Sequence, residues 1–356
     1  MTEELFADQE APEEAPKKRG KKITLIVLSS MLVLVLGGAA AAFWYLSSVR
    51  GAYEDAVNVL PEEHTFPDED TEEYEAPDPV TRDDGEEDEQ INILLIGSDS
   101  GGGSGETEDV PWLPNAGRAD TIMWMHIPHE RDSIQIMSIM RDTWVPIPGH
   151  GEAKINSSLS FGEGSSVAVA TLENLVGVPI DHVATVDMVG FQNLVGELGG
   201  VTVNVPESFS SRDGYHYTAG PQHMSPMEAM SFVRERQSFS DGDFTRVRNQ
   251  QAFMRGVLQE VLQPSTMTNP GQVHDMVSTF ASNMAVDSGL ADGGYVTDVA
   301  WSTRSVRGGD IDLFTLPNHG IGTAGSESIV VADFDAFAAA GEAMREGTFE
   351  EYAANN

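Results

Sequence analysis

The chain has 356 residues, a formal net charge of −37 and no cysteine. Without cysteine, disulfides, thiolate zinc sites and cysteine nucleophiles are excluded. The acidic excess argues against binding to nucleic acid, because a protein that follows a phosphate backbone needs the opposite charge.

The first part of the chain predicts a membrane anchor. Residues 23–46 contain no charged side chain, and a helix of that length can cross the hydrocarbon layer. A basic cluster at 17–22 precedes this run and acidic sequence follows it, which puts the N-terminus in the cytoplasm. We therefore predict a cytoplasmic tail at 1–22, a single-pass anchor in the cell membrane at 23–47, and an extracytoplasmic remainder. A cleaved signal peptide is the alternative, because small residues at 39–42 offer a cleavage site, but its apolar region would be unusually long.

The stretch after the anchor predicts a linker. Residues 48–90 are dense in aspartate and glutamate and contain scattered prolines. Such a run repels itself and lacks the apolar residues of a core, so we expect a disordered, acidic spacer. The remaining residues, 91–356, have the length of one large domain and contain no internal repeat.

Apolar runs in this domain predict strands that alternate with helices. Strands are expected at residues 92–97, 121–127, 133–139, 182–187, 201–205 and 311–316. Helices are expected at 165–176, 189–198 and 245–262, and a capping box followed by proline starts another helix at Ser225. This mixture predicts an α/β fold, a three-layer α/β/α sandwich around a mixed central sheet.

Acidic and basic side chains are expected to meet at one edge of that sheet. Asp99 follows the first strand and Asp120 precedes the second, so antiparallel pairing would put both carboxylates at the same edge. A further reversal into the third strand would bring Arg141 there, and Arg118 is close to Asp120 in sequence. Paired carboxylates with open positions are a usual way to hold Mg²⁺ beside a phosphate. Each aspartate alone is more often a turn or helix cap, so the predicted metal site depends on this pairing.

An arginine-rich segment predicts a site for a phosphorylated ligand. Four arginines lie within fifteen residues of this acidic chain: Arg234, Arg236, Arg246 and Arg248. A guanidinium is permanently charged and binds phosphate oxygens two at a time. Asp243 is expected to cap the following helix, whose first turns carry Arg246 and Gln250, and a helix N-terminus favours anions. The alternative is a structural network in which these arginines pair with Glu235, Asp241 and Asp243.

Several of these segments together resemble the LytR-CpsA-Psr family of membrane-anchored cell-wall ligases. The first motif is Asn92-Ile-Leu-Leu-Ile-Gly-Ser-Asp-Ser100, and the arginine-rich segment supplies residues 233–236 and 242–251. The other matching blocks are residues 118–122, 138–149, 154–156, 177–182, 186–191 and 198–203. They occur in the family's order over about residues 91–262, and an ordered series of this length is not expected by chance.

The resemblance implies an extracytoplasmic phosphotransferase. Family members transfer a glycopolymer from a polyprenyl-pyrophosphate carrier to a peptidoglycan hydroxyl and form a phosphodiester link, with the prenyl chain in an apolar tunnel between sheet and helices. Carried over to this chain, the ligands of Mg²⁺, or of Mn²⁺ in its place, are Asp99 and Asp120. The groups that hold the pyrophosphate are Arg118, Arg141, Arg234, Arg236, Arg246 and Gln250. The expected catalytic residues are Arg141, Asp243 and Arg118, and Asp243 would orient an arginine or assist proton transfer.

Two positions depart from the family's pattern. Many members have an arginine directly or shortly after the first aspartate, where this chain has Ser100 and a glycine run; part of the expected contact with phosphate is therefore missing. Met140 replaces the proline that usually precedes the arginine at Arg141, a change that the site should tolerate.

Two other functions would use the same residues. A Mg²⁺-dependent pyrophosphatase acting on lipid pyrophosphates would take water as the acceptor. A receptor or regulator would bind lipid-linked polymer without turnover. Substituting Asp120 by Asn would abolish turnover in either enzyme but leave a binding-only protein functional.

Overall fold

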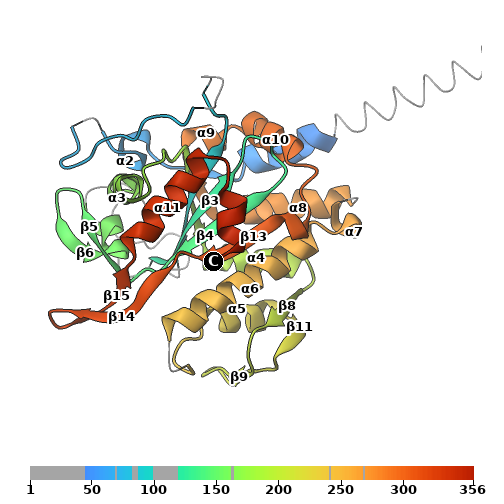
Figure 1. Ribbon diagram of the computed structural model, residues 1–356. Helices are drawn as coiled ribbons and strands as arrows, with labels where there is room; N and C mark the ends of the chain where they lie inside the picture. Colours follow the sequence, from blue (N-terminus) through green and yellow to red (C-terminus); the bar gives the residue numbers. More distant parts are fainter. Residues whose placement is uncertain are drawn as a thin grey trace, which may run out of the picture. The chain divides into compact units, whose positions relative to one another are not determined.

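The computed structural model describes residues 45–68, 70–81, 87–98, 119–161, 164–239, 242–267 and 269–356, with a seven-stranded mixed sheet at its centre (Figure 1). In spatial order the strands are β1 (Asn58–Val59), β12 (Met284–Val286), β7 (His182–Asp187), β2 (Ile91–Ser98), β3 (Ala119–Ile127), β4 (Ile134–Ile139) and β13 (Ile311–Thr315). Five of the six strands predicted from the sequence lie in this sheet. The expectation of a mixed α/β fold is confirmed.

Strand directions define two edges of the sheet. β2 runs antiparallel to β3 and parallel to β7, while β4 runs antiparallel to β3 and parallel to β13. The C-terminal ends of β2, β4, β7 and β13 therefore lie at one edge together with the start of β3, and we call this the carboxyl edge. The opposite edge, where β2, β4, β7 and β13 begin and β3 ends, is the amino edge.

Helices cover both faces of the sheet. Along β3, Ile122 and Trp124 pack on one face and Met123 and Met125 on the other, as expected for a strand buried on both sides. The first face packs against α3 (Ser166–Val176), α11 (Phe334–Arg345) and α12 (Phe349–Ala354). The second packs against α6 (Asp243–Val261), α9 (Ser288–Ala291) and α10 (Gly293–Ser302).

Local signals set the helix ends near the predicted site. Ser225 Oγ accepts a hydrogen bond from Glu228 N, and the Glu228 carboxylate accepts one from Ser225 N at 2.8 Å. This capping box starts α5 (Pro226–Arg234) as predicted. The predicted helices at 165–176, 189–198 and 245–262 correspond to α3, α4 (Met188–Glu197) and α6.

A second hydrophobic cluster lies on the far side of α6 from the sheet. It is formed by α4, α5, α6 and α8 (Pro270–Ala281) with the hairpin of β8 (Val201–Val205) and β11 (Gly220–Met224). Gly256 permits the close approach of α6 to β8, because a Cβ there would lie 2.6 Å from Thr202 O. A smaller hairpin, β9 (Phe209–Ser210) with β10 (His216–Tyr217), packs Tyr217 into the same cluster.

The remaining elements complete the unit. A four-stranded sheet contains β14 (Asn318–Ala324), β15 (Glu327–Ala332), β5 (Thr143–Ile147) and β6 (Gly151–Lys154). The short helices are α2 (Glu62–Thr65), α7 (Pro264–Met267) and the 3₁₀ helices η1 (Ile155–Ser160) and η2 (Gly308–Asp310). β5 and β6 follow directly after Arg141, so this sheet begins at the carboxyl edge.

The sequence predicts a disordered linker over residues 48–90, but the described part of this stretch is folded. β1 pairs in parallel with β12, and Leu60 and Val80 are only 3% and 5% exposed in the core on the α3 face. Tyr74 donates a hydrogen bond to the Glu173 carboxylate at 2.5 Å. The prediction was wrong here because a few isolated apolar side chains, separated by acids that remain at the surface, suffice to attach the segment to the core.

The membrane anchor stays a prediction. No helix among the described residues is both long enough and apolar enough to cross a membrane. The predicted tail at 1–22 and most of the predicted anchor at 23–47 lie outside the described residues.

Candidate active site

Three arginines from different elements converge on Asp243, the first residue of α6. Arg141, which follows β4, donates from Nε to Asp243 Oδ2 at 3.0 Å. Arg246, in the first turn of α6, lies 3.3 Å from the same oxygen, and Arg236, which follows α5, lies 3.9 Å from Oδ1. The sequence separation of Arg141 and Asp243 is 102 residues. The pairs that Arg236 and Arg246 make with Asp243 belong to the structural network named above as the alternative, and the roles of these residues in binding phosphate stay predictions.

The cluster combines buried and accessible guanidinium groups. The side chain of Arg246 is 5% exposed, that of Arg141 15% and that of Arg236 48%. Asp243 orients the three guanidinium groups, and Asp142 also lies 3.9 Å from Arg141. A phosphate group that approached from the accessible side would meet donors already held in place.

Two buried amides next to these arginines lack hydrogen-bond partners among the described residues. Gln250 Oε1 is one such atom, and both amide atoms of Asn249 are others; the two residues are 7% and 0% exposed. Leaving a buried polar group unsatisfied costs about 1–3 kcal/mol. Gln251 differs, because its Nε2 donates to Ser138 Oγ and Thr315 Oγ1 at 3.1 and 3.0 Å, where β4 and β13 end. This pair of bonds attaches α6 to the carboxyl edge.

The predicted metal ligands can be placed only through the backbone. Ser98 pairs with Ala119 in the antiparallel β2–β3 ladder, so the strand ends that Asp99 follows and Asp120 begins lie at the carboxyl edge, as predicted. Asp99 itself and the Asp120 side chain lie outside the described residues. Within the described part of the chain, no group of three acidic or histidine side chains forms a metal site.

The other predicted residues have separate positions. Arg118 lies outside the described residues. Arg234, the last residue of α5, lines a pocket together with Arg236 and Arg212. Arg248 points elsewhere, since it donates to Thr245 Oγ1 and lies 4.0 Å from Glu207 Oε1. Sequence reasoning missed Arg212, whose only signal is the turn sequence Ser211-Arg-Asp-Gly214.

Lys154 and Asp142 extend the charged group beside Arg141. Lys154 Nζ lies 3.6 Å from Asp142 Oδ1, and Arg141 Nε lies 3.9 Å from Asp142 Oδ2. Lys154 is also 3.7 Å from Glu327 at the start of β15. These contacts hold β5, β6 and β15 beside the site.

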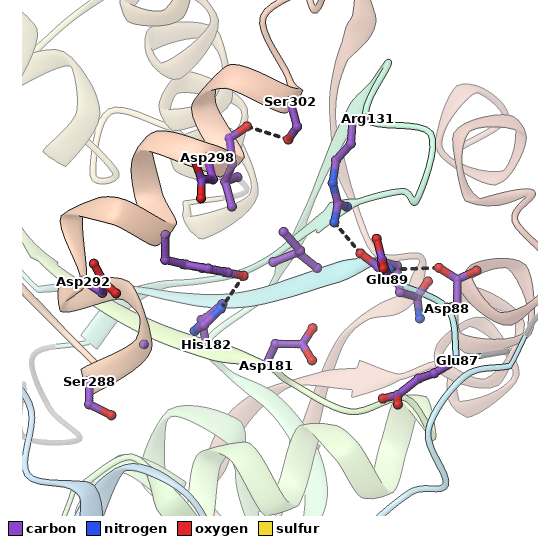
Figure 2. Close-up of a pocket in the computed structure, with 15 residues that line it drawn as sticks. Glu87, Asp88, Glu89, Arg131, Asp181, His182, Ser288, Asp292, Asp298 and Ser302 are labelled. Atoms are coloured by element: carbon purple, nitrogen blue, oxygen red, sulfur yellow. Dashed lines mark hydrogen bonds between the residues drawn. The ribbon is translucent and has the colours of Figure 1, made fainter. Parts of the chain in front are cut away.

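A large cavity at the amino edge has the opposite character. Its volume is about 1120 Å³, and Figure 2 shows acidic side chains around it. The acidic residues that line it are Glu87, Asp88, Glu89, Asp181, Asp292 and Asp298. A pyrophosphate would be repelled by this lining, so the arginine cluster, and not this larger cavity, is the candidate active site.

The polar groups of this cavity bind one another. His182 Nδ1 lies 3.1 Å from Asp287 Oδ1, and His182 Nε2 lies 2.8 Å from the Tyr295 hydroxyl. Arg131 donates to the carbonyl oxygen of Glu89, as Figure 2 shows, and to those of Ile127 and Pro128. These contacts join β2, β3, β7 and α10 at the amino edge and are structural.

Comparison with known proteins identifies the class to which this fold and site belong. The chain is a member of the LytR_cpsA_psr family, whose sequence model matches residues 61–344. The match begins within the predicted linker, in agreement with the folded segment seen there.

Individual relatives support this assignment. The polyisoprenyl-teichoic acid–peptidoglycan teichoic acid transferase TagU of Bacillus anthracis is 34% identical over 254 residues, which cover 71% of this chain and 76% of that protein. The protein of the same name from Enterococcus faecalis is 30% identical over 295 residues, covering 82% and 86%.

Solved structures show the same fold. B. subtilis TagV superimposes with a TM-score of 0.58 at 22% identity, over 73% of this chain and 97% of that one. A LytR-Csp2A-Psr enzyme from Actinomyces oris gives a TM-score of 0.55 at 22% identity, over 82% and 96%.

Proposed function

We propose that this protein is a membrane-anchored phosphotransferase that moves a glycopolymer from a polyprenyl-pyrophosphate carrier to peptidoglycan. The observation that carries the proposal is the convergence of Arg141, Arg236 and Arg246 on Asp243. The names of the TagU relatives describe transfer of this kind. The predicted anchor at 23–47 would hold the site near a lipid-linked donor.

In the proposed reaction a peptidoglycan hydroxyl attacks the phosphorus that carries the polymer. The new bond is the P–O bond of the phosphodiester, the bond that breaks joins this phosphorus to the bridging oxygen, and polyprenyl phosphate leaves. The hydroxyl proton is released to a base or to solvent. Because such transition states spread charge over phosphate oxygens, catalysis depends on positioning and on neutralising that charge.

The described residues supply these two functions. Arg141 and Arg246 would hold the non-bridging oxygens with forked donors, and Arg236, the most exposed of the three, would meet the donor as it enters. Asp243 would fix the guanidinium orientations from the N-terminus of α6. Gln250 would complete the contacts with the ligand by donating from its amide Nε2.

Mg²⁺ is the cofactor that we propose, with Mn²⁺ as a substitute. Asp99 and Asp120 would hold it at the carboxyl edge. When bound, the ion would add positive charge beside the leaving phosphate.

The test uses the full-length chain in detergent with a polyprenyl-pyrophosphate-linked saccharide and peptidoglycan oligomers. Mass spectrometry should detect a phosphodiester-linked conjugate with Mg²⁺ but not with EDTA, and Arg141→Ala and Asp120→Asn should lose it. Arg304→Ala, on an exposed side chain near the end of α10, is the matched control and should retain it.

Other outcomes would replace the proposal. Release of phosphate or a free polymer phosphate without conjugate would identify a pyrophosphatase. Donor binding with no product under any condition would identify a receptor and contradict the enzymatic assignment.

A further inference from the structure

A second pocket adjoins the arginine cluster on its solvent side. It has a volume of about 420 Å³ and is lined by Arg212, Asp213, Ser231, Arg234, Glu235, Arg236 and Gln237. Arg236 belongs to both places, because its Nη1 lies 3.9 Å from Asp243 Oδ1. A ligand bound at Asp243 could therefore extend directly into this pocket.

Arg212 reaches the pocket from a rigid turn between β9 and β10. Ser211 N donates to Tyr215 O at 2.9 Å, and Gly214, with φ of 89°, donates to Ser211 O at 3.1 Å. The turn is attached to α5 and the following segment, since Ser231 Oγ donates to Ser211 Oγ and Arg212 N donates to Glu235 Oε2. The backbone of Arg212 is thus held in place without any ligand.

Both acidic side chains of the pocket accept hydrogen bonds from other groups of the protein. Glu235 is 7% exposed, and its carboxylate accepts hydrogen bonds from the N–H groups of Arg212, Gln237 and Ser238. Burial by itself would raise the pKa of Glu235, but these backbone donors hold it below its ordinary value. Asp213 accepts a hydrogen bond from Ser231 Oγ at 3.1 Å.

Three of the exposed residues of the pocket are arginines, and one, Asp213, is an acid. Arg212, Arg234 and Arg236 are all exposed. The Arg212 guanidinium donates to the neutral amide of Gln237 at 2.5 Å, and no carboxylate among the described residues lies within ion-pair distance of it. In a chain of net charge −37, three accessible arginines around one pocket select an anion.

We propose that this pocket binds a second anionic group of the donor, a phosphate or carboxylate on the saccharide next to the pyrophosphate, and that Arg212 is its specificity-determining residue. The inference rests on the proposed function, because it takes the pyrophosphate to lie at Asp243. The lipid is excluded as the occupant by the polar lining of the pocket. We assign the pocket to the donor and not to the acceptor, because Arg236 lines both the pocket and the pyrophosphate site.

The test compares donors on the same polyprenyl pyrophosphate: one with a phosphate-bearing saccharide, one with a uronic acid and one with a neutral saccharide. Their Kd values are measured with the full-length chain in detergent without acceptor, and KM and kcat with acceptor. Arg212→Gln should raise Kd and KM about five- to tenfold for a charged donor, the loss of one exposed charge-assisted contact, and leave the neutral donor and kcat unchanged.

Controls separate the possible causes. Arg212→Lys should restore part of the affinity for the charged donor, and Arg304→Gln should have no effect. Circular dichroism checks that each variant is folded. Whichever of the two charged donors loses affinity identifies phosphate or carboxylate as the preferred group.

The proposal is overturned if Arg212→Gln weakens all three donors equally or none of them. The proposed function fails in a different way, with no conjugate formed by the unmodified protein from any donor. The Kd comparison needs no turnover, so the pocket would still be judged in that case.

Discussion

The two edges of the central sheet use charged groups in opposite ways. At the amino edge, Asp287 accepts hydrogen bonds from Val183 N and Leu290 N and pairs with His182, while Arg131 is bound to three carbonyl oxygens. At the carboxyl edge, three arginines share Asp243, and the buried Gln250 Oε1 has no partner among the described residues.

The charged groups of the amino edge therefore stabilise the fold, whereas those of the carboxyl edge are placed to bind a ligand. Polar groups that satisfy one another contribute to folding, whereas several guanidinium donors held in place at an accessible position are arranged to bind an anionic ligand. Cavity size alone would select the acidic cavity at the amino edge. The predominance of arginine selects the cluster at Asp243.

The first prediction compares an arginine-to-alanine substitution at each edge, and the largest loss of polymer transfer is expected at the carboxyl edge. Arg246→Ala should lower kcat for polymer transfer by about 10²- to 10³-fold, since it removes a phosphate-binding group that acts in the transition state. Arg131→Ala should leave transfer per folded molecule within about twofold and lower Tm instead. Rates are measured by mass spectrometry of the conjugate and Tm by calorimetry.

Because Arg246 is buried, Arg246→Lys serves as the second variant. It keeps the charge but loses the planar fork, so transfer should still fall by at least about tenfold while the protein folds. Equal losses of transfer for Arg131→Ala and Arg246→Ala would remove the distinction between the edges.

A second prediction concerns stability at the amino edge. Asp287→Ala should lower the free energy of unfolding by about 2–4 kcal/mol, because it leaves buried N–H groups and His182 without their acceptor and removes the cap of α9. Urea unfolding of the full-length chain measures the loss. Transfer per folded molecule should be unchanged; a hundredfold loss of kcat would place catalysis at this edge.

The positions of the strand ends at the carboxyl edge could be predicted because the sequence patterns that mark these strands and helices are local. Each strand is a continuous apolar run, and the capping box at Ser225 marks a helix start by residue type alone. One assumption, the antiparallel pairing of β2 with β3, then sufficed to bring the ends of these strands and Arg141 together. The register of Ser98 with Ala119 confirms that assumption.

Features that depend on tertiary contacts could not be predicted. β1 is two residues long and pairs with β12 more than 200 residues away, and the apolar residues around it are isolated among acids. Arg212 enters the site through a turn whose sequence would suit any exposed hairpin. The order of β14, β15, β5 and β6 likewise follows from packing and not from local pattern.

A third prediction uses the pH dependence of stability near the amino edge. His126 is 2% exposed, and burial together with the charge of Arg131 lowers its pKa to about 3. In the unfolded chain the pKa is about 6.5, so below that pH the unfolded state binds a proton that the folded state does not. The contribution of His126 to stability should therefore fall with decreasing pH by about 1.4 kcal/mol per unit between about pH 6 and 4.

The matched variant for this test is His126→Gln. Its amide can still donate to Asn92 Oδ1, which His126 Nδ1 contacts at 2.9 Å, but it does not titrate. The difference in unfolding free energy between the two proteins should narrow as pH falls. A constant difference from pH 7 to pH 4 would show that His126 is not held neutral.

The smallest effect is expected at the rim of the acidic cavity. Asp298 is exposed and lines the acidic cavity, and its charge also interacts with that of Arg50, so Asp298→Asn should change Tm by no more than about 2 °C in either direction. Polymer transfer should stay unchanged. A tenfold loss of transfer would mean that this cavity binds a substrate after all, and a fall in Tm of several degrees would mean that its acids are bound to a cation. A small effect at Asp298, set against a large one at Arg246, would show that polymer transfer depends on the charged groups of the carboxyl edge and not on those of the acidic cavity.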